Sequence, residues 1–333
     1  MRQVQGPALP AESSGQSKGD PAVLVLGLPR AGATWVAETL AAAPGTRLVN
    51  EPDNETSVPF AVRAKLPLGR YPVLGAGEQA PVTYRTLWAR AFGAADAPAG
   101  PRTRLAAALL RRLGPIERWN AFCRVQQPRA TMRLRAISAL AVPPRLRDAP
   151  SRVVVKSAHA AFAAEWIAAR WQPEVVVVLR HPYNVVASWT ELGWGGCGLD
   201  SNPKIVERYA RRWGVPALPA DCSRLSRVAW EIGLQLSVLE SAAAEHPDWV
   251  LVRHEDLCLD RAGRFQALYA ALGLEWTDDV EAHMRRSNRP AEGLVTMRVA
   301  EEQPERWRRR LDGDQLREID GVLDLFPAVS SSR

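Results

Sequence analysis

The sequence has few cysteines and no long apolar run, and both absences restrict what the protein can be. Four cysteines are spread through 333 residues, with no CxxC pair and no histidine at zinc-site spacing. We therefore expect separate free thiols in a reducing compartment and no bound metal. No stretch approaches the roughly 20 apolar residues that a membrane span requires. These absences predict a cytoplasmic protein without a membrane span.

The first 20 residues lack the apolar core of a signal peptide and are rich in glycine, serine and proline. They predict a disordered lead-in. The chain as a whole is 47% hydrophobic and 24% charged, an ordinary balance for a protein that buries a core. Its length suits one large α/β domain with an insertion, so we expect a single domain over residues 21–330.

Acidic residues are too few to balance the basic ones. The sequence has 43 lysines and arginines against 36 aspartates and glutamates, which gives a net charge of +7. The excess comes largely from arginine, whose planar guanidinium binds phosphate and sulfate bidentately. This balance favours anionic partners, but alone it does not separate nucleic acid, anionic lipid and phosphorylated small molecules.

Short, wholly apolar runs alternate with helical stretches along the chain. Such runs predict strands that are buried on both faces of a sheet. The expected strands are Ala22–Leu26, Arg47–Asn50, Val153–Val155, Val175–Leu179 and Trp249–Val252. The expected helices are Thr34–Ala43, Ala160–Trp171, Tyr183–Leu192 and Arg264–Leu272. The alternation predicts an α/β fold, a doubly wound parallel sheet flanked by helices.

Residues 59–150 form a long insertion that is rich in arginine, proline and alanine. Helices are expected in it at Arg104–Leu113 and Ile116–Arg124. The insertion is long enough to cover a cleft, and we assign it to the side of the cleft where a second substrate, the acceptor, would bind. A packed helical cap with a solvated basic face is an equal alternative.

A glycine loop follows the first expected strand. Residues 27–34 read GLPRAGAT and fit the pattern G-x-x-x-x-G directly before a helix. Backbone amides of such a loop and of the helix start bind a phosphate oxyanion. A nucleoside triphosphatase carries lysine immediately before Thr34, but here that residue is Ala33 and the cation is Arg30. The loop therefore favours a ligand with a single phosphate there; an ordinary glycine turn is the alternative.

A second, independent motif lies far from the loop. Arg180 stands at the end of the strand Val175–Leu179, and Ser188 follows eight residues later. An arginine at the carboxyl end of a parallel strand lies over the ligand crevice of the sheet. Together, GLPRAGATW and VVVVLRHPYNVVASW resemble the two nucleotide motifs of PAPS-dependent sulfotransferases, of the bacterial and carbohydrate type.

The resemblance implies a P-loop-type fold, PAPS as the sulfuryl donor, PAP as the product, and no metal. It implies that the 5′-phosphosulfate is bound by Pro29, Arg30, Ala31, Gly32, Ala33 and Thr34. It further implies that Arg180 and Ser188 bind the 3′-phosphate, that Trp35 packs on adenine, and that Arg298 closes over the nucleotide, with Arg306 and Arg308 as alternatives. The closing segment lacks the glycine signature of the family. Ala31 and Ala33 replace hydroxyl residues, so we expect weaker donor affinity.

Sulfuryl transfer requires a base for the acceptor proton and cations for the departing phosphate. Arg30 and Lys156 are the expected cations. Two bases compete. Glu51 resembles the glutamate of the N/Y-E-P segment in carbohydrate and bacterial sulfotransferases, whereas His159 lies one residue late for the K-x-H of small-molecule enzymes. We favour Glu51. Without a catalytic role, Glu51 would be a solvated loop carboxylate. His159 would then be only a residue near the start of a helix.

The resulting hypothesis is a sulfotransferase that acts on a hydroxyl or amine of an unidentified acceptor. A small molecule, a lipid or a carbohydrate all fit, and we expect no nucleic-acid partner. A non-catalytic protein that binds PAP or PAPS is the first alternative. A P-loop nucleotide kinase is the second, and Ala33 argues against it.

Overall fold

The computed structural model describes residues 21–93, 100–114, 118, 122, 132–144, 152–289 and 299–327. The expected lead-in and Arg298 lie outside these residues. A parallel sheet of five strands runs through the described chain in the order β2-β3-β1-β4-β5. Its strands are β1 (Val23–Leu26), β2 (Thr46–Asn50), β3 (Arg152–Ser157), β4 (Glu174–Leu179) and β5 (Val250–Arg253). The expected parallel α/β sheet is confirmed, with strand bounds that shift by one or two residues.

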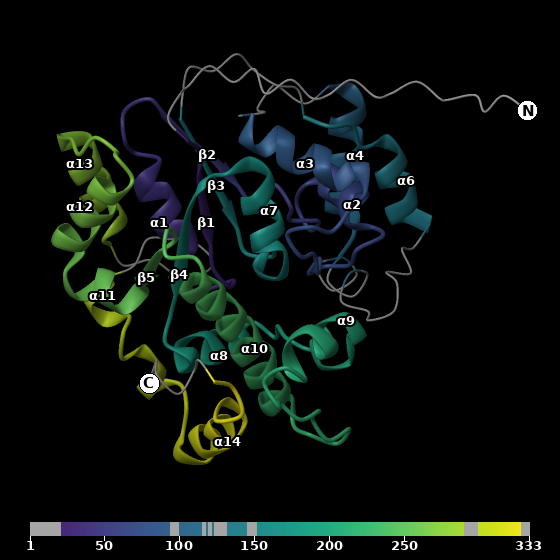
Figure 1. Ribbon diagram of the computed structural model, residues 1–333, viewed down its shortest axis with the longest axis vertical. Helices are drawn as coiled ribbons and strands as arrows, with labels where there is room; N and C mark the ends of the chain where they lie inside the picture. The colour runs from purple at the N-terminus through teal and green to yellow at the C-terminus, as the bar shows by residue number, and fades with distance from the viewer. Residues whose placement is uncertain are drawn as a thin grey trace, which may run out of the picture.

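Alternate residues of the strands face two separate cores. Val23 and Val25 of β1 pack on one face of the sheet, and Leu24 and Leu26 pack on the other. The first face is covered by α1 (Ala33–Leu40), α11 (His254–Leu259), α12 (Arg261–Ala271) and α13 (Asp278–Ser287). The second is covered by α2 (Pro59–Lys65), α3 (Val82–Phe92), α7 (Ala164–Trp171), α8 (Pro182–Glu191), α10 (Arg224–Glu245) and α14 (Gly313–Leu323). Figure 1 shows these helices on both sides of the sheet.

The segment between β2 and β3 is helical where it is described. It contains α2 and α3, and then α4 (Pro101–Arg112) and α6 (Met132–Leu140). The helix expected at Arg104–Leu113 corresponds to α4, which starts earlier because Pro101 is well suited to a first helical position. The helix expected at Ile116–Arg124 lies almost wholly outside the described residues. Helices α4 and α6 pack on α2 through a small apolar cluster of their own.

The longest helix, α10, was not among the expected elements. It has 22 residues and is capped by the preceding Ser223, whose hydroxyl accepts a hydrogen bond from Ser226 N at 3.0 Å. Such a cap satisfies an amide that the first turn leaves without a helical partner. The helix packs on β4 and α8 and therefore supports the strand and helix that carry Arg180 and Ser188.

Two of the expectations from cysteine and hydropathy can be compared with the structure. Cys222 and Cys258 are free, but Cys197 is disulfide-bonded, so the expectation of four separate thiols is wrong. Cysteines that are distant in sequence can still meet in a fold, and spacing alone does not reveal it. Among the described helices, none combines the length and the apolar character that spanning a membrane would take.

Candidate functional site

All five strands end at the same edge of the sheet, and the chemistry-bearing residues follow these ends. The glycine loop (residues 27–32) follows β1, and Arg180 follows β4. Glu51 follows β2. Lys156 is the second-last residue of β3 and pairs in register with Val25 of β1. Parallel topology therefore gathers groups from distant parts of the sequence along one edge, which is where open α/β sheets bind ligands.

The glycine loop contains two residues with a left-handed backbone. Arg30 and Gly32 have φ angles of 73° and 92°, both in the left-handed region. No described side chain caps the first turn of α1, which leaves its amides directed at the edge of the sheet. Such amides and the helix dipole attract an oxyanion.

Two glycines of the loop are required by close packing. A Cβ on Gly27 would lie 2.9 Å from the Val178 carbonyl oxygen, and one on Gly32 would lie 2.2 Å from Cδ2 of His254. The loop is thus pressed between β4 and the start of α11. Burial and the charge of Arg180 lower the pKa of His254 well below its usual value, so this imidazole is neutral.

Three hydrogen bonds connect the loop with β4 and α8. Arg180 Nη1 donates to the Arg30 carbonyl at 2.9 Å, and Arg30 Nε donates to Ser188 Oγ at 3.1 Å. In addition, Trp189 Nε1 donates to the Pro29 carbonyl at 2.9 Å. The structure therefore brings together the two motifs that the sequence places about 150 residues apart.

Arg180 retains an unused hydrogen-bond donor at this junction. Its side chain is half-buried, but its Nε atom is fully buried and has no hydrogen-bond partner within the described chain. Burial lowers its pKa to about 10, with Glu255 opposing the shift, so Arg180 is charged at neutral pH. A buried cation with an unsatisfied donor is costly unless an anion joins it. The position fits a phosphate group.

The other residues expected around the nucleotide are placed as follows. Trp35 is half-buried and meets the rings of His254 and Phe265 edge-on, at centroid distances of 5.7 and 5.1 Å. Arg308 lies over the Trp307 ring and pairs with Glu305, on the exposed surface.

The C-terminal segment contributes a cation that the sequence analysis missed. The charge of Arg310 acts on Arg180, and its Nε lies 3.0 Å from Glu191 Oε1. Stacking of His181 on Trp307, with a centroid distance of 5.8 Å, holds this segment on the start of α8. No sequence pattern near Arg180 or Arg310 indicates that the two residues lie close together.

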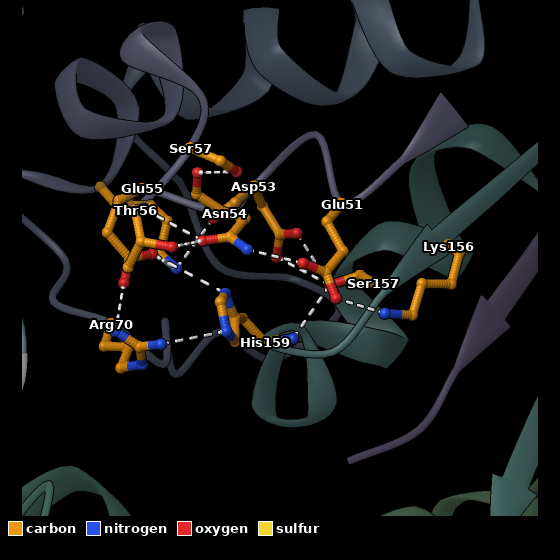
Figure 2. Close-up of polar contacts among 11 residues, drawn as sticks. Glu51, Asp53, Asn54, Glu55, Thr56, Ser57, Arg70, Lys156, Ser157 and His159 are labelled. Carbon is orange, nitrogen blue, oxygen red and sulfur yellow. Dashed lines mark hydrogen bonds and ion pairs between the residues drawn. The ribbon is translucent and has the colours of Figure 1, made fainter. Parts of the chain in front are cut away.

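Glu51 and Lys156 form an ion pair at the ends of β2 and β3 (Figure 2). The Glu51 backbone is left-handed, with a φ of 49°, and Asn54 Nδ2 donates to its second carboxylate oxygen at 2.6 Å. Burial raises the pKa of Glu51, but Lys156, Asn54 and Arg70 together lower it by more, so the net pKa is below the ordinary value. The half-buried side chain is therefore an anion, in the protonation state of a base.

A buried network lies beside this pair. Figure 2 shows Asp53 beside Glu51, and the Ser157 hydroxyl lies 2.8 and 2.9 Å from the two Asp53 oxygens. Glu55 accepts from Lys65 at 2.6 Å and from Arg70 at 2.7 Å. We call these residues, together with the Glu51–Lys156 pair and His159, the carboxylate network.

His159 lies inside the carboxylate network and is only 3% exposed. Arg70 Nη2 donates to its Nε2 at 3.4 Å, and its Nδ1 lies 3.7 Å from Glu55 Oε2. Burial, Lys65, Arg70 and Lys156 lower the pKa of His159 far below its usual value. The imidazole is neutral, but its lone pair at Nε2 faces a guanidinium. Of the two expected bases, Glu51 has the more open position.

The sequence analysis did not identify the supporting residues of either half. Trp189 and His254 hold the glycine loop, and Asn54 orients Glu51. The aromatic residue after Ser188 was a signal available in the sequence. The others lie at no recognisable spacing, because their partners come from separate strand ends.

Residues 21–278 match the family model described as "Sulfotransferase family". Among curated proteins, the comparison found no sequence match. Two solved structures resemble the chain weakly. One is a sulfotransferase domain of an olefin synthase from Synechococcus, with 14% identity, coverage of 96% of this chain and 98% of that one, and a TM-score of 0.43. The other is a mouse sulfotransferase in complex with PAP, with 11% identity, coverage of 91% and 83%, and a TM-score of 0.37.

Proposed function

The chain belongs to the sulfotransferase family, and on that premise we propose that it transfers a sulfuryl group from PAPS to a hydroxyl or amine of an acceptor. The observation that carries the choice of donor is the direct junction of the glycine loop with Arg180 and Ser188. A nucleotide with a phosphate on each side of its ribose has two anionic ends, and this junction offers two anion-binding positions side by side.

The proposed donor site divides into two parts. Loop amides from Pro29 to Thr34 and the Arg30 side chain hold the 5′-phosphosulfate. Arg180, through its buried Nε, and Ser188 hold the 3′-phosphate, which ATP lacks. Trp35 lies next to the loop on α1 and is proposed to contact adenine. PAPS supplies the activated sulfuryl group; the protein supplies position and charge.

Glu51 is the proposed base of the transfer. It accepts the proton of the acceptor hydroxyl while the oxygen attacks the sulfur in line with the departing phosphate oxygen. Lys156 bonds to Glu51 and lies on the strand beside the glycine loop. When Glu51 gains a proton, the charge of Lys156 is no longer compensated, and it is free to stabilise the charge that forms on the PAP phosphate. Arg30 acts on the same charge from the loop.

The test of this function is transfer of radiolabelled sulfate from ³⁵S-labelled PAPS to a panel of hydroxylated and amine-bearing acceptors. The expected result is an acceptor that gains label in step with PAP release, and only with active protein. Tight PAP binding without label in any acceptor would favour a non-catalytic PAP-binding protein. Binding of ATP with magnesium, without binding of PAP, would favour a nucleotide kinase.

The acceptor side is proposed to lie over the carboxylate network, next to the helices between β2 and β3. A small molecule, a lipid or a carbohydrate remains the proposed acceptor class. Location in the cytoplasm stays a prediction, and the disulfide at Cys197 is at odds with it, because cytosolic reductants keep thiols reduced. Cell fractionation with thiol labelling of Cys197 separates the two.

A further inference from the structure

Helices α4 and α6 carry exposed arginines, and the described segments that contain these helices have no acidic residue. In the described segments 100–114 and 132–144, six arginines occur and no aspartate, glutamate or lysine does. All six side chains are exposed: Arg102, Arg104, Arg111, Arg112, Arg133 and Arg135. The net charge of the whole chain is +7, so these two segments account for nearly all of it. We call the exposed surface of these two segments the arginine face.

The two helices pack side by side. Their apolar sides are turned inward, where Leu110 and Leu134 lie in one small cluster with Val62 of α2. Arg102 Nη2 donates to the Ala139 carbonyl at 3.4 Å, which places the start of α4 beside the end of α6. Figure 1 shows both helices at the periphery of the molecule, on the opposite side from α11 to α13.

Two large apolar side chains are exposed within the arginine face. Leu105 is 52% exposed and Met132 is 87% exposed, and they belong to only six exposed large hydrophobic residues in the described chain. Arginines alone would suit any polyanion. Exposed apolar side chains among them gain nothing from a water-soluble polyanion, whereas they lose unfavourable hydration at the boundary between lipid headgroups and acyl chains.

We propose that the arginine face binds a membrane surface that contains anionic lipid. The guanidinium groups contact phosphate or carboxylate headgroups, and Leu105 and Met132 enter the interface. Arginine suits this role because its fork binds a phosphate through two hydrogen bonds. The proposal concerns a peripheral contact, needs no membrane-spanning helix, and does not depend on the function proposed for the strand-end site.

The test is co-sedimentation of the full chain with vesicles of phosphatidylcholine, with or without about 30 mol% phosphatidylserine, at about 0.1 M salt. Arg104, Arg111 and Arg112 are changed together to Gln. Because each arginine near an anionic surface contributes roughly fivefold in binding, the variant should bind phosphatidylserine vesicles about 100-fold more weakly. Circular dichroism establishes that the variant is folded.

A matched control removes three exposed arginines from elsewhere, with the variant Arg285→Gln, Arg286→Gln and Arg317→Gln. It has the same net charge as the first variant and should bind vesicles within about threefold of the wild type. Equal losses in both variants would overturn the proposal, since net charge would then explain the binding. Absence of wild-type binding to phosphatidylserine vesicles would overturn it as well.

A third variant separates a membrane from a soluble polyanion. Changing Leu105 and Met132 to Gln should weaken vesicle binding at least about tenfold, since the burial of two apolar side chains is lost even if it is partial. Binding to polyadenylate or dextran sulfate should be unchanged. If vesicle binding is unaffected and the soluble polyanions bind at least as tightly as vesicles, the arginine face is a polyanion site and the membrane proposal is wrong.

Discussion

The glycine loop and the carboxylate network lie at the same edge of one sheet, but their cations have different partners. In the loop region, Arg180 donates to a carbonyl, and its Nε has no hydrogen-bond partner within the described chain. In the carboxylate network, Lys65, Arg70 and Lys156 all contact glutamate oxygens.

This difference indicates which kind of ligand each region can bind. A guanidinium that donates to a neutral carbonyl keeps an electrostatic attraction for an anion, and the Arg180 Nε, which has no partner in the described chain, adds a directed hydrogen bond. Cations that are already neutralised by buried carboxylates offer little to an anionic ligand, and instead fix the charge state of their neighbours. The first region suits a bisphosphate nucleotide and the second a neutral group that must lose a proton.

The largest expected effect breaks the acceptor side alone. Glu51→Gln should lower the rate of sulfuryl transfer about 10²–10⁴-fold, because the amide cannot accept the proton. PAP affinity should not fall, because Glu51 is not proposed to touch the nucleotide, and the uncompensated charge of Lys156 in this variant favours PAP. Steady-state kinetics and calorimetry measure the two quantities. Undiminished turnover would shift the role of base to His159, and the exposed Glu207→Gln variant serves as the control.

The next effect breaks the nucleotide side alone. Arg180→Ala should weaken PAP binding about 10- to 100-fold, which is the usual contribution of a hydrogen bond to a charged group. Binding of adenosine 5′-phosphate, which has no 3′-phosphate, should weaken far less. The ratio of the two dissociation constants, measured by calorimetry, checks the assignment. Equal losses for both nucleotides would mean that Arg180 does not serve the 3′-phosphate.

These expectations rest on a site that the sequence specified only in part. The strand Val23–Leu26, the glycine loop, Arg180 and Ser188 were predictable, because a buried parallel strand, a glycine turn and a residue at a strand end each leave a local pattern. Local patterns also placed Glu51 and Lys156 at strand ends. Which strands are neighbours, however, is decided by packing between distant segments.

The carboxylate network shows most clearly what could not be predicted. Glu55, Lys65 and Arg70 are charged residues of types that are usually exposed, yet all three are buried. Their burial depends on mutual pairing, which no periodicity records. Helix α10 is different: its 22 residues were open to prediction from an amphipathic pattern, and the sequence analysis passed over it.

A moderate effect is expected on how the stability of the fold depends on pH, through Asp53 of the carboxylate network. Burial raises the pKa of Asp53 from 3.8 to about 6. The folded protein therefore binds a proton between these pH values that the unfolded chain has released, so stability falls as pH rises through this window. Asp53→Asn should abolish that contribution, which is about 3 kcal/mol. Urea unfolding near about pH 4 and about pH 7 measures it; the exposed Asp221→Asn variant should keep the wild-type difference.

The smallest effect concerns the orientation of the base. Asn54→Ala removes the hydrogen bond to Glu51 Oε2 and one of the causes that lower the pKa of Glu51. The acidic limb of the transfer rate should therefore move to higher pH. Lys156→Gln should move it further in the same direction, because the charge of Lys156 is the larger cause. A limb that stays in place in both variants would contradict Glu51 as the titrating base.

The central claim is that a bisphosphate nucleotide is gripped jointly by the glycine loop and the end of β4. Calorimetric titration of the wild-type chain with PAP and with adenosine 5′-phosphate tests it most directly. The account predicts that PAP binds about 10- to 100-fold more tightly, since only PAP presents a second phosphate to Arg180 and Ser188. Equal affinity for the two nucleotides would contradict the account.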